Sequence, residues 1–536
     1  MSAQGRSPGR GPDPLSRSAA GGRNPWLIAV VISIATFMQV LDTSIANVAL
    51  QYIAGSLAAS VDESTWVLTS YLVASAVILP ISGWLSGVVG RKRFYMACVA
   101  TFTVSSVLCA LAPNLQMLIF FRVLQGIGGG GMAPSEQAML ADTFPENKRS
   151  LAFALYGVAV LVAPTVGPTI GGWLTDNLSW HWIFLINGPI GAISLVLVNW
   201  LVTEPEALEQ ERKERIARGL KVDWIGFILV ALFLGCLEIV LDKGQEDDWF
   251  SSNFIVFFAA VSFVSFVLFV PWELMHKEPI VDLKLYGYTA FASSSLMMLA
   301  VGAILFGTTQ LIPQLLQEVY QYSATLSGLA LMPGGLAMLM LMPVVGVLAA
   351  HVPVKYLIAG GMASIGLAMF HMTSLSGQAD FSFYAWARVL QTVGLPFVFI
   401  PITSASYTGL PPQKTSEASS LINVARNLGG SIGISVATTI IARGSQVHQN
   451  YLADHLVPSS SAYQQAIANA TTALTAQGVP AAVAPTAAFD YISQVVMQQA
   501  ALLAYIDVFR DFALLALLMA PLALILLRAR TPRAAH

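Results

Sequence analysis

The stretch "WLIAVVISIATFMQVLDTSIANVAL", residues 26–50, decides the fold class. It stays apolar over a length that can cross a lipid bilayer, for which about 20 such residues are needed. It also contains a carboxylate, Asp42, although a charge at the centre of a membrane helix costs at least about 2.5 kcal/mol. The segment therefore predicts a membrane helix whose acid has a specific partner or function.

The composition extends this prediction to the whole chain. Its 536 residues are 56% hydrophobic and 10% charged, with a mean hydropathy of +0.68, whereas soluble proteins carry about 25% charged residues. We therefore expect a polytopic membrane protein. The net charge of −2 argues against a nucleic-acid partner. The seven histidines and three cysteines show no metal-ligand spacing, so neither a metal nor a cofactor is expected.

Fourteen apolar segments follow one another along the chain. Basic residues predict their orientation, because Lys and Arg concentrate in the cytoplasmic loops of membrane proteins. With both termini cytoplasmic, the outer side receives only Lys243, Arg443 and Arg510 of the 27 Lys and Arg residues, and three more lie inside helices. The predicted segments are 26–50, 65–86, 93–112, 115–140, 151–172, 182–201, 224–241, 254–272, 289–312, 325–346, 356–375, 382–407, 417–441 and 507–528.

An internal repeat divides these segments into two halves. The stretch "FFRVLQGIG" at 120–128 matches "WARVLQTVG" at 386–394 with an offset of 266 residues, and "PISGWLSGVVGRK" at 80–92 matches "PVVGVLAAHVPVK" at 343–355 with an offset of 263. The near-equal offsets predict an all-α membrane protein of two parallel six-helix bundles with an inserted helix pair, as in major facilitator transporters. The expected units are a disordered cytoplasmic tail (1–24), an N-terminal bundle (25–202), linkers with the inserted pair (203–288), a C-terminal bundle (289–528) that includes an outer loop (442–506), and a cytoplasmic tail (529–536).

Three motifs resemble signatures of the major facilitator superfamily. "GWLSGVVGRKR", residues 83–93, resembles the loop after helix 2, although the family usually has Asp where Gly87 stands. "RVLQG", residues 122–126, resembles the helix 4 signature, and "APTVGPTIGG", residues 163–172, resembles the helix 5 signature of exporters that work by antiport. Prolines in such a stretch break helical hydrogen bonds, and glycines allow a neighbouring helix to pack closely. The gating and antiporter residues implied by these motifs are Gly83, Gly90, Arg91, Pro164, Gly167, Pro168, Gly171 and Gly172.

Other stretches are similar to the fourteen-helix drug:proton antiporters, most closely to the EmrB branch and more distantly to the QacA type. They are "LDTSIANVAL" (41–50), "WVLTSY" (66–71), "WHWIFLINGPIG" (180–191) and "SSLINVARNLGGSIG" (419–433). The resemblance implies a secondary active transporter, not an enzyme, that exports hydrophobic or cationic drugs from the bacterial cell in exchange for protons. It also implies an EmrA-like periplasmic adaptor and a TolC-like outer-membrane channel as partners. A dedicated exporter of one metabolite or siderophore, and a transport-inactive scaffold or sensor, remain as alternatives.

Asp42, Arg122 and Glu136 are the candidate residues for proton coupling. At 1.5 Å per residue, Asp42 lies about 12 Å and Arg122 about 10 Å from the outer ends of their helices, so the two lie at similar depth. An acid that binds either a proton or a cation provides exchange, whereas a permanent Asp42–Arg122 pair would be structural. Glu136 lies about 31 Å along helix 4, where it handles protons or substrate or is an interfacial carboxylate.

Polar residues of helices 1 and 13 are the candidates for lining a substrate cavity. Gln39, Thr43 and Asn47 form a stripe beside Asp42 on helix 1. Asn423 and Arg426 belong to helix 13, where they either line the cavity or hydrogen-bond across helices. Arg388 repeats Arg122, but helix 9 has no acid that would repeat Asp42. Proton coupling is therefore expected in the N-terminal half.

Four further expectations concern the outer side of the membrane. The loop 442–506 is rich in Ala, Gln, Ser and Thr and forms either surface helices or a flexible loop. Glu238 is expected at the membrane interface, and Tyr71 in an aromatic belt. Asp507 and Asp511 are expected at the N-terminus of the last helix, where acids are favourable.

Overall fold

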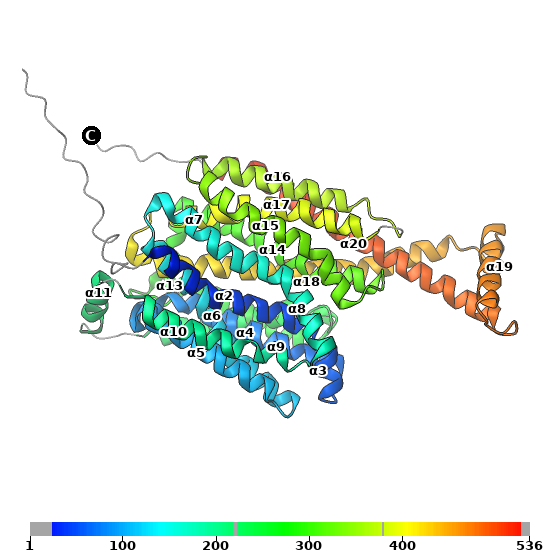
Figure 1. Ribbon diagram of the computed structural model, residues 1–536, viewed down its shortest axis with the longest axis horizontal. Helices are drawn as coiled ribbons and strands as arrows, with labels where there is room; N and C mark the ends of the chain where they lie inside the picture. Colours follow the sequence, from blue (N-terminus) through cyan, green and yellow to red (C-terminus); the bar gives the residue numbers. More distant parts are fainter. Residues whose placement is uncertain (1–23, 205, 218–221, 378–379, 527–536) are drawn as a thin grey trace, which may run out of the picture.

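The computed structural model describes residues 24–204, 206–217, 222–377 and 380–526, and these residues form helices and connecting turns without a β-strand (Figure 1). The predicted tails at 1–24 and 529–536 lie outside the described residues, except for Asn24. The Asn24 side chain caps the first helix, because its Oδ1 accepts a hydrogen bond from the Trp26 backbone nitrogen at 3.0 Å. The all-α fold class predicted from the sequence is confirmed.

The long helices follow the predicted apolar segments. Thirteen helical spans of the described residues are long and apolar enough to cross a membrane. Helix α6, with 29 residues and a central glycine run, corresponds to the remaining predicted segment. The bounds are α2 (Pro25–Val48), α4 (Val61–Val89), α5 (Arg91–Ala110), α6 (Leu115–Thr143), α7 (Glu146–Gly157), α8 (Ala163–Asn177), α10 (Asn187–Leu201), α12 (Trp224–Lys243), α13 (Asn253–Met275), α14 (Thr289–Glu318), α15 (Ala324–Leu348), α16 (Val354–Met372), α17 (Phe381–Ser406), α18 (Thr415–Asp454) and α20 (Ala484–Leu526).

Short elements connect these helices. The π-helical turn η1 joins α7 to α8, so that the two form one span. Helix α11 lies in the linker that follows α10. The bounds of the short elements are α3 (Leu50–Ser56), η1 (Val158–Val162), α9 (Trp182–Leu185), α11 (Glu206–Ala217), η2 (Trp249–Ser251), η3 (Leu283–Gly287), η4 (Pro412–Lys414) and α19 (Ser461–Ala476).

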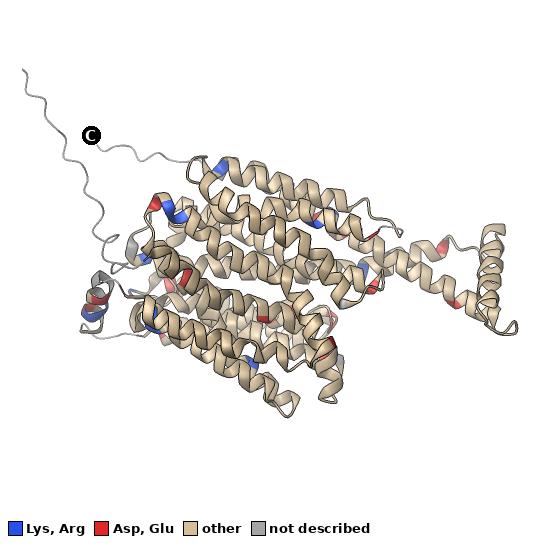
Figure 2. Cartoon of the chain, viewed as in Figure 1, with Lys and Arg blue, Asp and Glu red and all other residues tan. Residues whose placement is uncertain are grey.

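The two ends of the molecule differ in character. We call the end that carries the start of α5 and helix α11 the basic end, because Arg91, Lys92 and Arg93 begin α5 there. The opposite end is the arm end, from which α18, α19 and α20 project far beyond the other helices (Figure 1). Figure 2 shows that charged residues are sparse along the middle of the bundle. This distribution is typical of a protein whose middle faces hydrocarbon and whose ends face water.

Two six-helix bundles face each other in the structure. The first contains α2, α4, α5, α6, the α7–α8 span and α10, and the second contains α14 to α18 and α20. Helix α15 packs against α7 and α8, and α18 packs against α4 and α6, so these helices form the contact between the bundles. Of the inserted pair, α12 packs against α4, and α13 packs against α12. This is the major facilitator architecture that the repeat predicts.

The arm corrects the predicted bounds of the last two segments. Helix α18 continues to Asp454 and α20 already begins at Ala484, so the helices pass well beyond the predicted limits at 441 and 507. Asp507 and Asp511 therefore lie inside α20 rather than at its N-terminus, and Asp507 pairs with His448 of α18 at 2.8 Å. Hydropathy misses these extensions because Ala and Gln form helices well without being strongly apolar. Of the two alternatives for 442–506, surface helices are confirmed.

Glu238 of α12 corrects a second expectation. Its side chain is 7% exposed and accepts a hydrogen bond from the Ser431 hydroxyl of α18 at 2.7 Å. One turn further along α12, Asp242 accepts a hydrogen bond from the Thr69 hydroxyl of α4. The expected interfacial position was wrong, because α12 places this face against two other helices and not toward the membrane surface.

A crossing of α14 and α18 provides a test of the packing. A Cβ atom added at Gly302 would collide with the Arg426 backbone carbonyl, whereas one added at Gly360 of α16 would meet nothing within 4 Å. Gly302→Ala should therefore lower stability by about 1–3 kcal/mol, the usual cost of overpacking. Gly360→Ala should be neutral or slightly stabilising, because Ala favours helix by about 1 kcal/mol over Gly. Thermal unfolding of the two detergent-purified variants measures this difference, and equal midpoints would contradict it.

Candidate functional site

Asp42 lies in a shell of hydrogen-bond donors from two other helices. Its Oδ2 forms an ion pair with the Arg122 guanidinium of α6 at 2.7 Å. Its Oδ1 accepts hydrogen bonds from the side-chain amides of Gln125 at 3.0 Å and Asn187 at 2.6 Å. Asp42 is 2% exposed and Arg122 is fully buried. The predicted neighbours Asp42 and Arg122 thus meet, and hydrogen-bond donors contact both oxygens of the Asp42 carboxyl group.

The surroundings of Arg122 explain how α6 holds a buried cation. Its Nε donates to the Val67 backbone carbonyl at 2.9 Å, and its guanidinium lies 4.4 Å from the centre of the Tyr71 ring, at a distance where a ring face attracts a cation. The Tyr71 side chain is buried, so the expected position in an aromatic belt was wrong. One terminal nitrogen of Arg122, Nη2, has no hydrogen-bond partner.

Sequence reasoning missed the two amides of this site. Gln125 follows Arg122 by three residues, which places both side chains on one face of α6, and Arg122 Nη1 also donates to Gln125 Oε1 at 2.7 Å. That spacing was a signal available in the sequence. Asn187 comes from the start of α10, 145 residues away from Asp42, and nothing in the local pattern distinguished it.

The C-terminal half repeats this arrangement without an acid. Arg388 Nη1 donates to Gln391 Oε1 at 2.7 Å, as Arg122 does to Gln125. The repeat offset of 266 residues relates Asp42 to Thr308, and the Thr308 hydroxyl accepts hydrogen bonds from Gln391 at 2.5 Å and Arg388 at 3.4 Å. A neutral hydroxyl therefore takes the position of the carboxylate, in agreement with the acid missing from helix 9.

Glu136 is completely buried near the basic end of α6. Its Oε1 accepts a hydrogen bond from the Ser33 hydroxyl of α2 at 2.5 Å, and its Oε2 has no hydrogen-bond partner. The alternative of an interfacial carboxylate was wrong, because α2 covers the side chain.

Asn423 and Arg426 of α18 form hydrogen bonds across that contact. Arg426 Nη1 donates to the Tyr156 hydroxyl of α7 at 2.7 Å, and the same hydroxyl donates to Asn423 Oδ1 at 3.2 Å. Asn423 Nδ2 donates to Gln137 Oε1 of α6 at 2.7 Å. Tyr407 of α17 also donates to Gln137, at 3.3 Å. Sequence reasoning missed Gln137, Tyr156 and Tyr407, which are partners supplied by distant segments.

The polar stripe on α2 is not brought into this cluster. Thr43 donates to the Val40 carbonyl of its own helix at 2.8 Å, and Asn47 is exposed. Gln39 is half-buried, and its Oε1 has no hydrogen-bond partner. Gln39 therefore has a buried polar atom left open for a partner, as does Thr36 of the same helix.

The helix 5 motif brings α8 close to α2. Pro168 has no N–H group, so the Pro164 carbonyl lacks its usual helical donor, and the Ser44 hydroxyl of α2 donates to that carbonyl at 3.1 Å instead. A Cβ atom at Gly167 would collide with Ser44, and one at Gly171 would lie 2.9 Å from the Ile45 side chain. Gly172 is buried in the same helix. The motif thus fixes α8 beside the segment that carries Asp42.

The loop after α4 is held at the basic end by three contacts. The Arg91 guanidinium pairs with Asp142 of α6, and its backbone nitrogen donates to Glu204 Oε1 at 2.9 Å. Gly90 has a φ of 102°, a conformation that side chains disfavour. A Cβ atom at Gly83 would lie 2.8 Å from the Glu417 backbone of α18. Of these residues, Gly83 therefore lies where the two halves touch.

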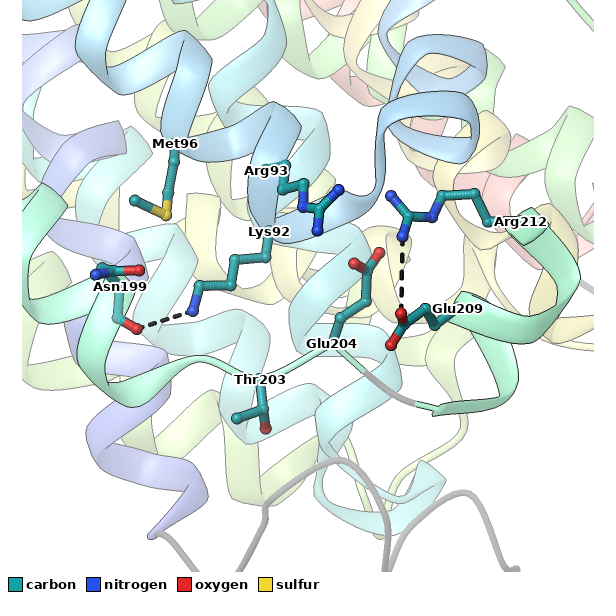
Figure 3. Close-up of a pocket in the computed structure, with 8 residues that line it drawn as sticks. All are labelled: Lys92, Arg93, Met96, Asn199, Thr203, Glu204, Glu209 and Arg212. Carbon is teal, nitrogen blue, oxygen red and sulfur yellow. Dashed lines mark hydrogen bonds and ion pairs between the residues drawn. The ribbon is translucent and has the colours of Figure 1, made fainter. Parts of the chain in front are cut away.

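A cavity of about 580 Å³ opens beside this loop (Figure 3). Lys92 and Arg93 of α5 line one side of it, and Glu209 and Arg212 of α11 line another. Lys92 Nζ donates to the Asn199 carbonyl at 2.8 Å, as the dashed line in Figure 3 shows. None of the predicted substrate-cavity residues lines it, so this is a surface feature of the basic end.

The buried ion pair makes a prediction about stability. Arg122→Gln leaves the Asp42 carboxylate without its cationic partner, and breaking a buried pair in this way costs about 3–5 kcal/mol. The double variant Asp42→Asn/Arg122→Gln has no charge at this position and should recover most of this loss. Thermal unfolding of the purified variants, followed by tryptophan fluorescence, measures both. A double variant that unfolds at or below the midpoint of the single variant would show that the pair is not the source of the stability.

Comparison with known proteins places the chain in a family. The model of the Major Facilitator Superfamily matches residues 32–434. The multidrug export protein EmrB of Haemophilus influenzae is 38% identical to this chain over 448 residues, which are 82% of this chain and 86% of the relative. EmrB of Escherichia coli is 38% identical over 433 residues, which are 81% of this chain and 83% of the relative. The structure of the human organic anion transporter MFSD10 agrees in fold, with a TM-score of 0.56 at 13% identity over 92% of this chain and 99% of that chain. The chain belongs to the Major Facilitator Superfamily, in the branch of the EmrB multidrug export proteins.

Proposed function

We propose that the protein is a proton-coupled antiporter that exports hydrophobic toxic compounds across the inner membrane of a bacterium, with both termini in the cytoplasm. The EmrB relatives support the export of drugs, and the helix 5 pattern supports antiport. The observation that carries proton coupling is the buried Asp42–Arg122 pair, at 2.7 Å, because intramembrane acids mark proton pathways. The basic end is then the cytoplasmic face, and the arm lies in the periplasm.

Asp42 exchanges a proton in this mechanism. As an anion it holds Arg122 and Gln125 of α6 and Asn187 of α10. Protonation removes the charge that attracts these donors, so α2, α6 and α10 lose their common contact. A cationic or polar group of the drug takes the place of the proton in the other phase of the cycle. One site that accepts either ligand, but not both together, is sufficient for exchange.

Helix α6 connects this site to the contact between the halves. It carries Arg122 near Asp42, and Glu136 and Gln137 about 21–23 Å further along at 1.5 Å per residue. Gln137 bonds to Asn423 of the other half. A shift of α6 on protonation would therefore act on the hydrogen bonds that hold the bundles 25–202 and 289–528 together, and would favour their rocking. Arg426, Asn423, Gln39, Thr43 and Asn47 are the residues proposed to meet the drug as the halves part.

The alternative of a transport-inactive scaffold rested on the missing acid at Gly87. In the structure Arg91 of the same loop pairs with Asp142 of α6. An acid on a neighbouring helix thus supplies a partner for the basic loop, and the argument for an inactive protein loses its support.

Asp42→Asn should abolish drug export driven by a pH gradient, because an amide cannot carry a proton through the cycle. We expect at least about a hundredfold loss of gradient-driven efflux, as for removal of a required proton-transfer group. Dye efflux from proteoliposomes with an imposed pH gradient measures it. Glu238→Gln is the matched control, since its amide oxygen can still accept the hydrogen bond from Ser431, and it should retain efflux. Full gradient-driven export by Asp42→Asn would refute the coupling role.

We further propose that the arm binds a periplasmic adaptor of the EmrA type, which connects the transporter to a TolC-like channel. The arm projects beyond the bundle (Figure 1). Its outer surface presents the exposed side chains of Val447, Tyr451 and Phe489. Aromatic side chains outside the lipid are favoured at protein interfaces, and they support this assignment.

The arm can be tested separately from transport. Tyr451→Ala combined with Phe489→Ala should leave dye efflux from proteoliposomes unchanged, because both residues lie far from the helices that carry Asp42. In whole cells the same variant should lose drug resistance and its cross-link to a co-expressed EmrA-type adaptor. Gln465→Ala, an exposed polar change on α19, should keep both. Wild-type cross-linking and resistance in the aromatic variant would exclude these residues from the interface.

A further inference from the structure

Arg388 of α17 is a buried cation without an acidic partner. Its side chain is 1% exposed. Its hydrogen bonds go to neutral acceptors: Gln391 Oε1 at 2.7 Å, Thr309 Oγ1 at 3.0 Å and Thr308 Oγ1 at 3.4 Å. Its Nε is buried and has no hydrogen-bond partner. Among the described residues no Asp or Glu oxygen lies within 4.0 Å of this guanidinium, in contrast to Arg122.

The free-energy cost of burying Arg388 without a counter-charge is the reason to look for an anionic ligand. A buried charge without a counter-charge is destabilising by several kcal/mol, even when hydrogen-bonded to neutral groups. The repeat makes the contrast direct, because Arg122 and Gln125 correspond to Arg388 and Gln391, while Asp42 corresponds to Thr308. The C-terminal half thus retains the guanidinium and amide of this arrangement and leaves out the carboxylate. An external carboxylate would complete it.

The location of Arg388 fits a ligand that arrives between the halves. Gly334 of α15 faces it, since a Cβ atom there would lie 2.8 Å from Arg388 Cγ. The next residue, Gly335, faces the other half, where a Cβ atom would lie 2.9 Å from Thr165 of α8. Helix α15 therefore separates the Arg388 guanidinium from the contact between the bundles, with a glycine on each side. This contact opens in a rocking motion. Guanidinium groups bind carboxylates with two parallel hydrogen bonds.

We propose that Arg388, with Thr308, Thr309 and Gln391, forms a binding site for the carboxylate of an anionic amphiphilic substrate. The apolar part of such a molecule would lie between the bundles, and the carboxylate would take the position that Asp42 takes in the N-terminal half. The role of this site in transport rests on the proposed efflux function, but binding to it does not. Cationic substrates would not use Arg388, because like charges repel.

The test compares two ligands that differ in charge. Binding of laurate, at a pH at which it is ionised, is measured on the purified full chain against dodecanol, which has the same alkyl chain. The wild type should bind laurate at least about tenfold more tightly than dodecanol, which corresponds to about 1.4 kcal/mol. Equal affinities would overturn the proposal. Added sodium chloride should leave laurate binding unchanged. Strong competition by chloride would mean a site for small inorganic anions, and would also overturn it.

Thr308→Asp is the decisive variant, because it copies Asp42 into the C-terminal half. The introduced carboxylate would form an internal ion pair with Arg388. Laurate binding should therefore fall at least about tenfold, while dodecanol binding stays constant. Thr308→Asn is the neutral control of similar size and should keep the preference for laurate. Arg388→Gln should remove the preference as well, which keeps the test valid if Thr308→Asp folds poorly. Unchanged laurate binding in Thr308→Asp or in Arg388→Gln would contradict the site.

Dye efflux separates this proposal from the proposed function. A wild type that exports no cationic dye under a pH gradient would refute the efflux function, while the binding comparison on the purified chain still tests the site. A loss of laurate preference in Thr308→Asp that Thr308→Asn does not share is the result that supports the carboxylate site.

Discussion

A carboxylate buried among apolar helices is the constraint on which the N-terminal half depends. Removing such a charge from water costs several kcal/mol unless hydrogen bonds and a counter-charge surround it. Asp42 meets this requirement with Arg122 and Gln125 of α6 and Asn187 of α10. Three helices must therefore meet at one point, and the glycines of α8 allow a fourth to close in beside them. Asp42 therefore also determines how the helices of the N-terminal half pack.

The two halves of the repeat share an arrangement of buried side chains but differ in its charge. Each half keeps an Arg and a Gln three residues apart, joined by a hydrogen bond of 2.7 Å. The partner position differs, with a carboxylate in Asp42 and a hydroxyl in Thr308. The charges of Asp42 and Arg122 thus balance each other, while Arg388 has no counter-charge. Under the proposals above, this asymmetry would place proton exchange and carboxylate binding at separate sites, one in each half.

Much of this fold, and part of the site, could be predicted from the sequence. Helix rise alone placed Asp42 and Arg122 at similar depth, and the structure joins them. Tertiary neighbours could not be predicted in this way. Asn187 and Gln137 are amides in apolar runs, and their roles depend on helices that come from distant segments. Glu238 was placed at the interface because it lies one turn from the outer end of its helix, and this position does not reveal that α18 covers it. The arm helices escaped detection because hydropathy measures apolarity, not helix propensity.

The strengths of these contacts suggest which parts of the molecule move. Inside the N-terminal half, the Asp42–Arg122 pair would cost about 3–5 kcal/mol to break while charged. Across the halves, Gln137–Asn423 and Gln137–Tyr407 are neutral hydrogen bonds, each worth about 0.5–1.5 kcal/mol. The charged donor of Arg426 to Tyr156 adds about 1.5–3 kcal/mol. Each contact between the bundles is therefore weaker than the ion pair within one of them. Under the proposed function, rocking breaks contacts that are individually weak, and protonation of Asp42 would loosen the N-terminal bundle itself.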